Sequence, residues 1–174
     1  AEPMVKDPVF VDWDDEGRMW VGELRTYMRD LDGTGENERM SRVMVLEDTD
    51  KDGVMDKATP FVDDMVNVRC IAFVEGGVLV VESGALWLCK DKDGDLRCDE
   101  REKLIDFATA AHSNIEHAEN ALHYALDNWM YNSKSSRKLA WRKGKLIEMP
   151  AKARGQWGMA SDAYGRLYFN ANSN

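Results

Sequence analysis

The sequence predicts an all-β protein, specifically a β-propeller, and three observations support this prediction. Apolar residues fall in short runs close to period two, and Gly, Asp and Asn turns separate the runs. One strand-turn-strand phrase also occurs four times. Repeated two-strand units at irregular spacing are typical of propeller blades, because each blade buries its faces only against its neighbours. We therefore expect about four blades or partial blades, with residues 1–174 forming a single, incomplete propeller domain.

The predicted strands follow one another from the first residues to the last. They comprise 9–11, 19–21, 43–46, 71–74, 78–81, 85–88 and 167–169. The stretch 134–154 is rich in Lys and Arg, and we interpret it as a solvated loop and hairpin in preference to a site for a polyanion.

The four copies of the repeated phrase place a Gly or Asn between two strands, at Gly17, Gly76, Asn128 and Gly165. These residue types adopt a positive φ at low cost, which a tight hairpin turn requires. A β-sandwich also contains many short strands, but it does not predict four copies of one phrase.

The segment 106–126 allows two interpretations. Ile115, Ala118, Leu122 and Ala125 lie at helical spacing, so a short helix is one of them. We favour a loop of about 15 residues, a length usually associated with function, that leads into a strand at 122–126.

Composition excludes several classes of protein. The 32 acidic and 23 basic side chains give a formal charge of −9, which argues against binding to nucleic acid through phosphate neutralisation. No apolar run approaches the roughly 20 residues of a membrane-spanning helix. The motifs of serine hydrolases, P-loop enzymes and Rossmann dehydrogenases are absent from the sequence.

Two Asp-rich loops carry oxygen ligands at alternating positions, as calcium sites do. The acids of 91–102 have the spacing of an EF-hand loop, with Leu96 where a Gly is usual; those of 48–56 match its first nine positions. The predicted ligands are Asp91, Asp93, Asp95, Asp99 and Glu102, and Asp48, Asp50, Asp52 and Asp56. The stretch 30–38 fits more loosely. The alternative for all three is a solvated hairpin with Asx-turns; bound calcium would be structural, holding the loops between strands.

The histidines His112, His117 and His123 lie close together in the sequence, but their spacing matches no common zinc pattern. A neutral imidazole beside a carboxylate is a good general base, and Glu116 and Glu119 are the local candidates to orient His117. The alternative is an ordinary surface or core histidine.

The remaining chemically distinctive residues are Trp and Cys. The six Trp lie mostly in strand patterns and favour packing between blades over a ligand platform. Cys89 and Cys98 flank the loop 90–97, where a hairpin brings them within reach of a disulfide; free thiols are the equal alternative.

Several phrases together resemble one family. DEGRMWVGELRTY at 15–27, RVMVLEDTDKDGVMDKATPFVDDM at 42–65, NIEHAENALHYALDNWMY at 114–131 and GQWGMASDAYGRLYF at 155–169 are similar to the N-terminal propeller of the bacterial membrane-bound dehydrogenase family. These sorbosone and glucose dehydrogenase-like proteins are often fused to a haem c domain.

The resemblance implies a six-bladed propeller, of which the remaining blades lie in the same polypeptide or in another chain. It further implies an exported, periplasmic protein that oxidises a sugar or alcohol with calcium and pyrroloquinoline quinone, and that passes electrons to a haem c domain or cytochrome. His117 would be the base, and Arg69 and Arg25 would bind the anionic quinone.

Two alternatives from other functional classes stay open. One is a non-catalytic propeller that docks beside a cytochrome, and the other is a calcium-dependent carbohydrate-binding module. Affinity for the quinone separates the dehydrogenase from both.

Overall fold

The computed structural model describes residues 3–107 and 118–171, and every regular element in this part of the chain is a β-strand. The prediction of an all-β protein is confirmed. Within the same residues, no helix has the length and the apolar character to cross a membrane.

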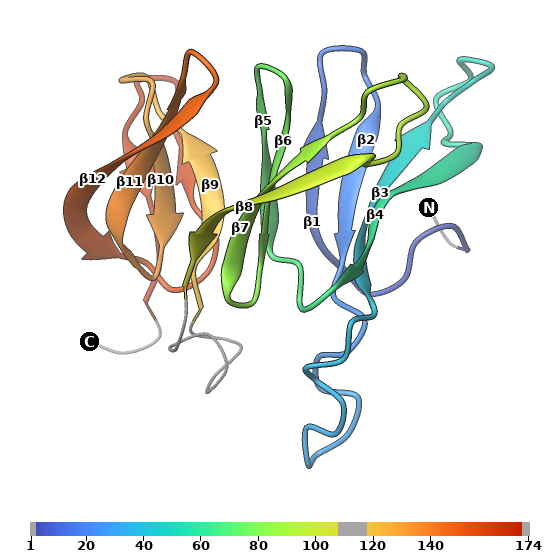
Figure 1. Cartoon of the computed structure of the whole chain (residues 1–174), viewed down its shortest axis with the longest axis horizontal. Coiled ribbons are helices and arrows are strands. Elements are labelled where there is room, and N and C mark those ends of the chain that lie inside the picture. Colours follow the sequence, from blue (N-terminus) through green and yellow to red (C-terminus); the bar gives the residue numbers. More distant parts are fainter. Residues whose placement is uncertain (1–2, 108–117, 172–174) are drawn as a thin grey trace.

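The strands form three four-stranded antiparallel sheets and one hairpin, each built from consecutive strands (Figure 1). The first sheet has the order β1 (Pro8–Trp13), β2 (Met19–Glu23), β3 (Ser41–Glu47) and β4 (Lys57–Met65). The second has the order β5 (Cys70–Val74), β6 (Gly77–Glu82), β7 (Ala85–Lys90) and β8 (Glu100–Asp106).

The third sheet contains β9 (Asn120–Tyr124), β10 (Met130–Ser133), β11 (Ser135–Arg142) and β12 (Lys145–Arg154). The hairpin pairs β13 (Ala160–Ser161) with β14 (Leu167–Tyr168). The basic stretch thus forms the β11–β12 hairpin, as the solvated interpretation predicted.

The repeated phrase corresponds to the first two strands of each sheet and to the final hairpin. Gly17, Gly76, Asn128 and Gly165 occupy the four turns, with φ values of 79°, 88°, 60° and 78°. All four predicted turn residues therefore adopt the left-handed conformation for which Gly and Asn are suited.

The segment before the third sheet differs in part from both interpretations. Residues 120–124 form strand β9 and not a helix, and Leu122 of this strand packs in the core between sheets. The strand also begins two residues earlier than the favoured 122–126. Residues 108–117 lie outside the described residues.

Two buried clusters join neighbouring sheets. The first lies between the first and second sheets and includes Trp20, Phe61 and Val80; the second lies between the second and third sheets and includes Leu79, Leu122 and Met130. The ring of Trp20 meets those of Phe61 and Phe73 edge-on, at 4.7 and 5.2 Å between centroids, as expected for a Trp that packs between sheets.

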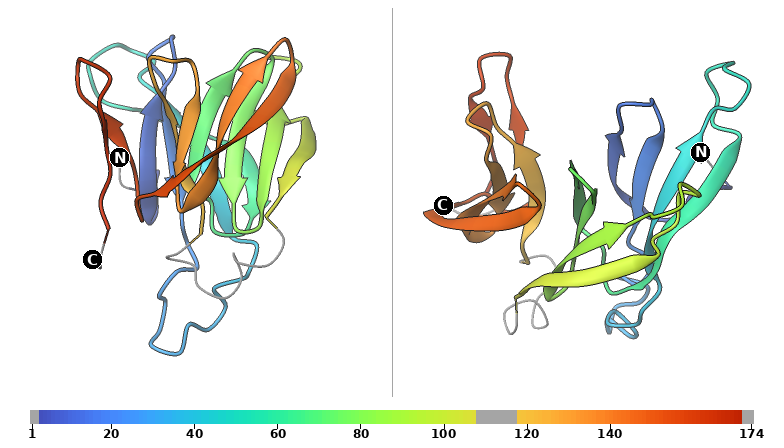
Figure 2. Two further views of the ribbon diagram at one scale, coloured as in Figure 1. Left: turned by 90° about the vertical axis from the view of Figure 1, so that its left-hand side faces the viewer. Right: turned by 45° about the horizontal axis from the view of Figure 1, so that its top comes forward.

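The three sheets stand side by side and fan around a common side, so that their first strands β1, β5 and β9 approach one another (Figure 2). The chain segment before β13 reaches the same side. This arrangement brings the starts of all four repeats around one pocket.

Candidate functional site

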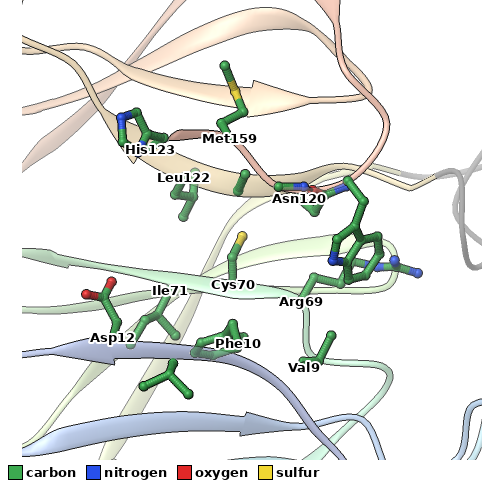
Figure 3. A pocket seen from close by; sticks show the side chains of 14 residues that line it. Val9, Phe10, Asp12, Arg69, Cys70, Ile71, Asn120, Leu122, His123 and Met159 are labelled. Carbon is green, nitrogen blue, oxygen red and sulfur yellow. Dashed lines mark hydrogen bonds between the residues drawn. The ribbon is translucent and has the colours of Figure 1, made fainter. Parts of the chain in front are cut away.

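The pocket at the meeting point of the repeats has a volume of about 290 Å³ (Figure 3). Its walls are formed by β1, by β5 with the residue before it, by β9, and by residues 157–159. Figure 3 shows Arg69 and Asn120 toward one end of the pocket and Asp12 and His123 toward the other.

Arg69 is a buried cation with an incomplete set of partners. Its side chain is 2% exposed, and its Nη2 donates a hydrogen bond to Ser83 Oγ at 3.1 Å. Its Nε and Nη1 are buried and lack any hydrogen-bond acceptor in the described part of the chain. Burial lowers the pKa of Arg69 to about 10, so the guanidinium stays charged at neutral pH.

Trp157 lies against this guanidinium, with 5.7 Å between Arg69 Cζ and the ring centroid. A network around Asn120 holds the Trp157 segment: Asn120 Nδ2 donates to Gln156 O at 2.9 Å, and Gly158 N donates to Asn120 Oδ1 at 2.8 Å. Ser133 Oγ donates to Gly158 O at 2.8 Å. Trp157 is therefore fixed beside the cation by buried amides.

Arg25, the second predicted anion-binding residue, has a different environment. Glu23 is fully buried and accepts a hydrogen bond from Arg42 Nε at 2.6 Å and one from Lys6 N at 2.8 Å. Arg25 Nε lies 3.7 Å from the same carboxylate. Arg25 is thus part of a structural ion cluster, and it does not line the pocket of Arg69.

The opposite end of the pocket carries acid-base groups. His123 Nε2 and Ser161 Oγ are 3.1 Å apart and share a hydrogen bond between β9 and β13. Asp12 of β1 lines the same pocket. His123 is therefore an imidazole that faces the pocket and that belongs to a predicted histidine group, although the sequence favoured a different member of that group.

The predicted base His117 and its candidate partner Glu116 lie outside the described residues. The other candidate, Glu119, is in contact with Arg137, whose Nε is 3.7 Å from Glu119 Oε1. Burial raises the pKa of Glu119, against the opposing effects of a hydrogen bond from Ser135 and the charge of Arg137.

The two Asp-rich loops each bring three of the predicted calcium ligands together. Oxygens of Asp48, Asp50 and Asp56 lie within 4.8 Å of one another, and so do those of Asp91, Asp93 and Asp99. Each loop connects the third and fourth strands of its sheet. Oxygen clusters of this size have the donor chemistry that calcium prefers.

The two loops share one backbone fold. The amide of Gly53 donates to Asp48 Oδ2 and that of Leu96 to Asp91 Oδ2, both at 2.9 Å. Thr49 N donates to Asp56, and Lys92 N donates to Asp99 in the same way. The loops are thus two copies of one structure, although only the second resembles a complete EF-hand loop in sequence.

Three of the predicted ligands lie outside these groups. Asp52 and Asp95 accept hydrogen bonds from the backbone two residues later, at Val54 and Arg97, as Asx-turns do. Glu102 lies within strand β8 and pairs with Lys90, whose Nζ is 3.9 Å away. Because strand β8 begins at Glu100, the twelfth position of the EF-hand pattern, Glu102, lies in a strand and not in the loop.

The loose third stretch forms turns of its own. Asp30 Oδ1 accepts hydrogen bonds from the amides of Asp32 and Thr34, and those from Thr34 lower the pKa of Asp30. Among the described residues, its acids do not gather as those of the other two loops do. The Asx-turn alternative describes this stretch.

Trp157, Asn120, Asp12 and His123 are pocket residues that the sequence did not single out for this place. One signal was present: each lies in or just before the first strand of a repeat, and these strands meet at the pocket. The pattern does not say which of their side chains face inward, because that depends on the bulges of β1 and β9.

Comparisons with known proteins add one result. No curated protein matches the chain, and no solved structure matches it. One family model, described as a domain of unknown function (DUF7133), matches residues 1–174, and the chain therefore belongs to the DUF7133 family.

Proposed function

We propose that this chain is a calcium-stabilised part of a β-propeller that binds an anionic quinone, pyrroloquinoline quinone, and serves as a sugar or alcohol dehydrogenase. The three sheets and the final hairpin would be successive blades of a six-bladed ring. Support for the ring comes from the order of strands within each sheet and from the approach of β1, β5 and β9 around one pocket.

The observation that carries the proposal is the buried Arg69, two of whose donors lack acceptors among residues 3–107 and 118–171. A charge removed from water costs several kcal/mol unless a partner compensates it. The Nε–H and Nη1–H groups of a guanidinium lie on opposite sides of Cδ and diverge, so the two donors would each bond a separate oxygen of an anionic cofactor. Trp157 offers an adjoining aromatic face for a flat ring system.

Acid-base groups support the assignment to a dehydrogenase. Oxidation of an alcohol requires removal of the hydroxyl proton, while the quinone supplies the hydride acceptor. His117 is the proposed base from the family resemblance. His123, at the end of the pocket away from Arg69, is the imidazole whose contacts suit the same task.

The proposal also includes bound calcium, export of the protein and an electron acceptor. Calcium at the two acidic loops would hold the outer strands of the first and second sheets. The protein would be exported to the periplasm and would pass electrons to a haem c domain or cytochrome.

A titration tests the proposal. Pyrroloquinoline quinone is added to the calcium-loaded protein, and quenching of tryptophan fluorescence is followed. We expect saturable binding by the wild type and a loss of at least about 30-fold in affinity for Arg69→Met, because a charge-assisted pair is removed. Arg25→Met is the matched control and should bind as the wild type does.

The same variants separate a binding role from a structural one. Because Arg69 is a poorly satisfied buried charge, Arg69→Met should leave the free energy of unfolding unchanged or raise it. Unchanged affinity in Arg69→Met would refute the proposed site. Absence of quinone binding by the wild type would favour the docking-module alternative.

A further inference from the structure

Two thiols are in contact at the base of the acidic loop 91–99. Cys89 is fully buried in β7, whereas Cys98, just before β8, is half-buried. The two side chains interact electrostatically, Cys98 packs against the core cluster that contains Cys89, and Cys98 Sγ donates a hydrogen bond to Glu100 O at 3.2 Å. Both cysteines are free in the structure.

The backbone holds the two residues beside each other without a covalent bond. Asp99 N donates to Lys90 O at 2.9 Å, and Lys90 is paired with Glu100 in the β7–β8 ladder. Cys98 N donates to Phe61 O at 2.8 Å, which fixes the loop against β4. A disulfide between residues held in this way needs little movement of the main chain.

We propose that Cys89 and Cys98 are a disulfide-forming pair that links the two ends of the acidic loop. With glutathione disulfide as oxidant, the more accessible Cys98 attacks one sulfur and releases one glutathione. Cys89 then attacks the mixed disulfide and releases the second. Two electrons and two protons pass from the cysteine pair to glutathione disulfide, which becomes two glutathione molecules. The reaction requires neither a quinone nor a metal.

The third cysteine provides a matched control. Cys70 is also buried, but it belongs to the other cluster, between the second and third sheets. The proposal therefore assigns one disulfide to the protein and leaves Cys70 as a thiol.

Mass spectrometry tests the pairing. The whole chain is equilibrated with glutathione disulfide in the presence of a metal chelator, unfolded with an alkylating agent, and digested with trypsin without reduction. We expect peptide 70–90 linked to peptide 98–101, both in the wild type and in Cys70→Ala. Alkylated Cys98, Cys98 that carries only glutathione, or a link that Cys70→Ala abolishes would each overturn the proposal.

Thermal melts supply a second readout. A cross-link over this short loop should raise the melting temperature by roughly 5–10 °C on oxidation, and reduction should reverse the rise. Cys98→Ser, a conservative change at a half-buried position, should melt at the same temperature in both buffers. A redox-dependent shift that persists in Cys98→Ser would contradict the assignment.

Discussion

Two arginines, Arg25 just after strand β2 and Arg69 just before strand β5, have opposite environments. Arg25 shares the buried carboxylate of Glu23 with Arg42, whereas Arg69 is buried beside Ser83 and Trp157. Pairing offsets the desolvation cost of a buried charge, but burial of a poorly paired one costs free energy and is expected where a ligand supplies the counter-charge. Arg69 is for this reason the stronger binding residue of the two.

Asp14 shows a stabilising role for an acid in the first repeat turn. Its Oδ2 accepts hydrogen bonds from Trp20 Nε1 at 2.8 Å and Arg18 Nε at 2.6 Å, and its Oδ1 accepts from the amide of Arg18. Burial acts to raise the pKa of Asp14, but these hydrogen bonds outweigh it and hold the pKa below the ordinary 3.8. Asp162 caps the last repeat turn in the same way.

Asp14 should therefore make stability depend on pH. A carboxyl whose pKa is lower in the folded state contributes stability above its unfolded pKa, and this contribution is lost as the pH falls below about 4. We expect Asp14→Asn to lose about 1 kcal/mol of unfolding free energy at pH 7 and nothing near pH 2. Urea denaturation across this range measures it. The exposed Asp15→Asn is the control, and equal losses in the two variants at every pH would contradict the role.

At the scale of elements, the two acidic loops both need a positive φ at two positions, but each loop has its glycine at a different one of the two. In the first loop Lys51 and Gly53 have φ values of 64° and 91°; in the second, Gly94 and Leu96 have 82° and 65°. Each loop thus places one residue with a side chain in the left-handed region, at a cost of about 1 kcal/mol. The missing Gly at position 96 is therefore no obstacle to the loop fold.

Exchanging these residues should change stability in opposite directions. Lys51 is exposed, so Lys51→Gly should raise the unfolding free energy by up to about 1 kcal/mol through relief of backbone strain. No atom lies within 4 Å of a Cβ added at Gly94, so Gly94→Ala should lower it by a similar amount from conformation alone. Chemical denaturation in chelator measures both; a fall in stability for Lys51→Gly would contradict the explanation.

Calcium should act on the same loops. If the clusters bind it, saturating calcium raises the melting temperature by roughly 5–10 °C, and a strong chelator reverses the rise. Asp91→Asn and Asp48→Asn should each remove part of this shift. Asp95→Asn is a matched control, because Asp95 lies outside the three-carboxylate group. A melt that chelator leaves unchanged would refute calcium binding.

At the scale of the whole molecule, β6 connects the two interfaces between sheets. Val78 and Val80 pack toward the first sheet, whereas Leu79 and Val81 pack toward the third. Successive side chains of a strand point to opposite faces, so a strand buried on both sides reads as the continuous apolar run 78–81. Each sheet is consequently stabilised by its neighbours.

Truncation of side chains on the two faces of β6 should weaken packing against different neighbouring sheets. Leu79→Ala should cost about 3–4 kcal/mol and Val80→Ala about 2 kcal/mol, since both side chains are fully buried. Hydrogen exchange should show lost protection in the third sheet for Leu79→Ala and in the first sheet for Val80→Ala. The same pattern in both variants would contradict independent interfaces.

The sequence alone predicts the apolar strands and the repeat turns well, because apolar runs and turn residues are local features of the sequence. Apolar runs identify β2, β3, β5, β6 and β7, and the positive-φ turns identify the repeats. It misses β4 and β8 as strands. The solvent face of β8 is charged and its apolar face short, so backbone pairing with β7 decides its structure more than side-chain pattern does.

The candidate site, too, has a part that the sequence predicts and a part that only the tertiary structure reveals. Local spacing is enough to predict that three carboxylates gather in each acidic loop, because a loop of nine residues folds its own carboxylates together. Contacts between residues that are far apart in the sequence can be identified only from the tertiary structure. Only the packing of sheets buries Arg69 beside Trp157, and only the pairing of β2 with β3 brings Arg42 to Glu23, because burial and charge pairing depend on which strands meet and not on the residues next in the chain.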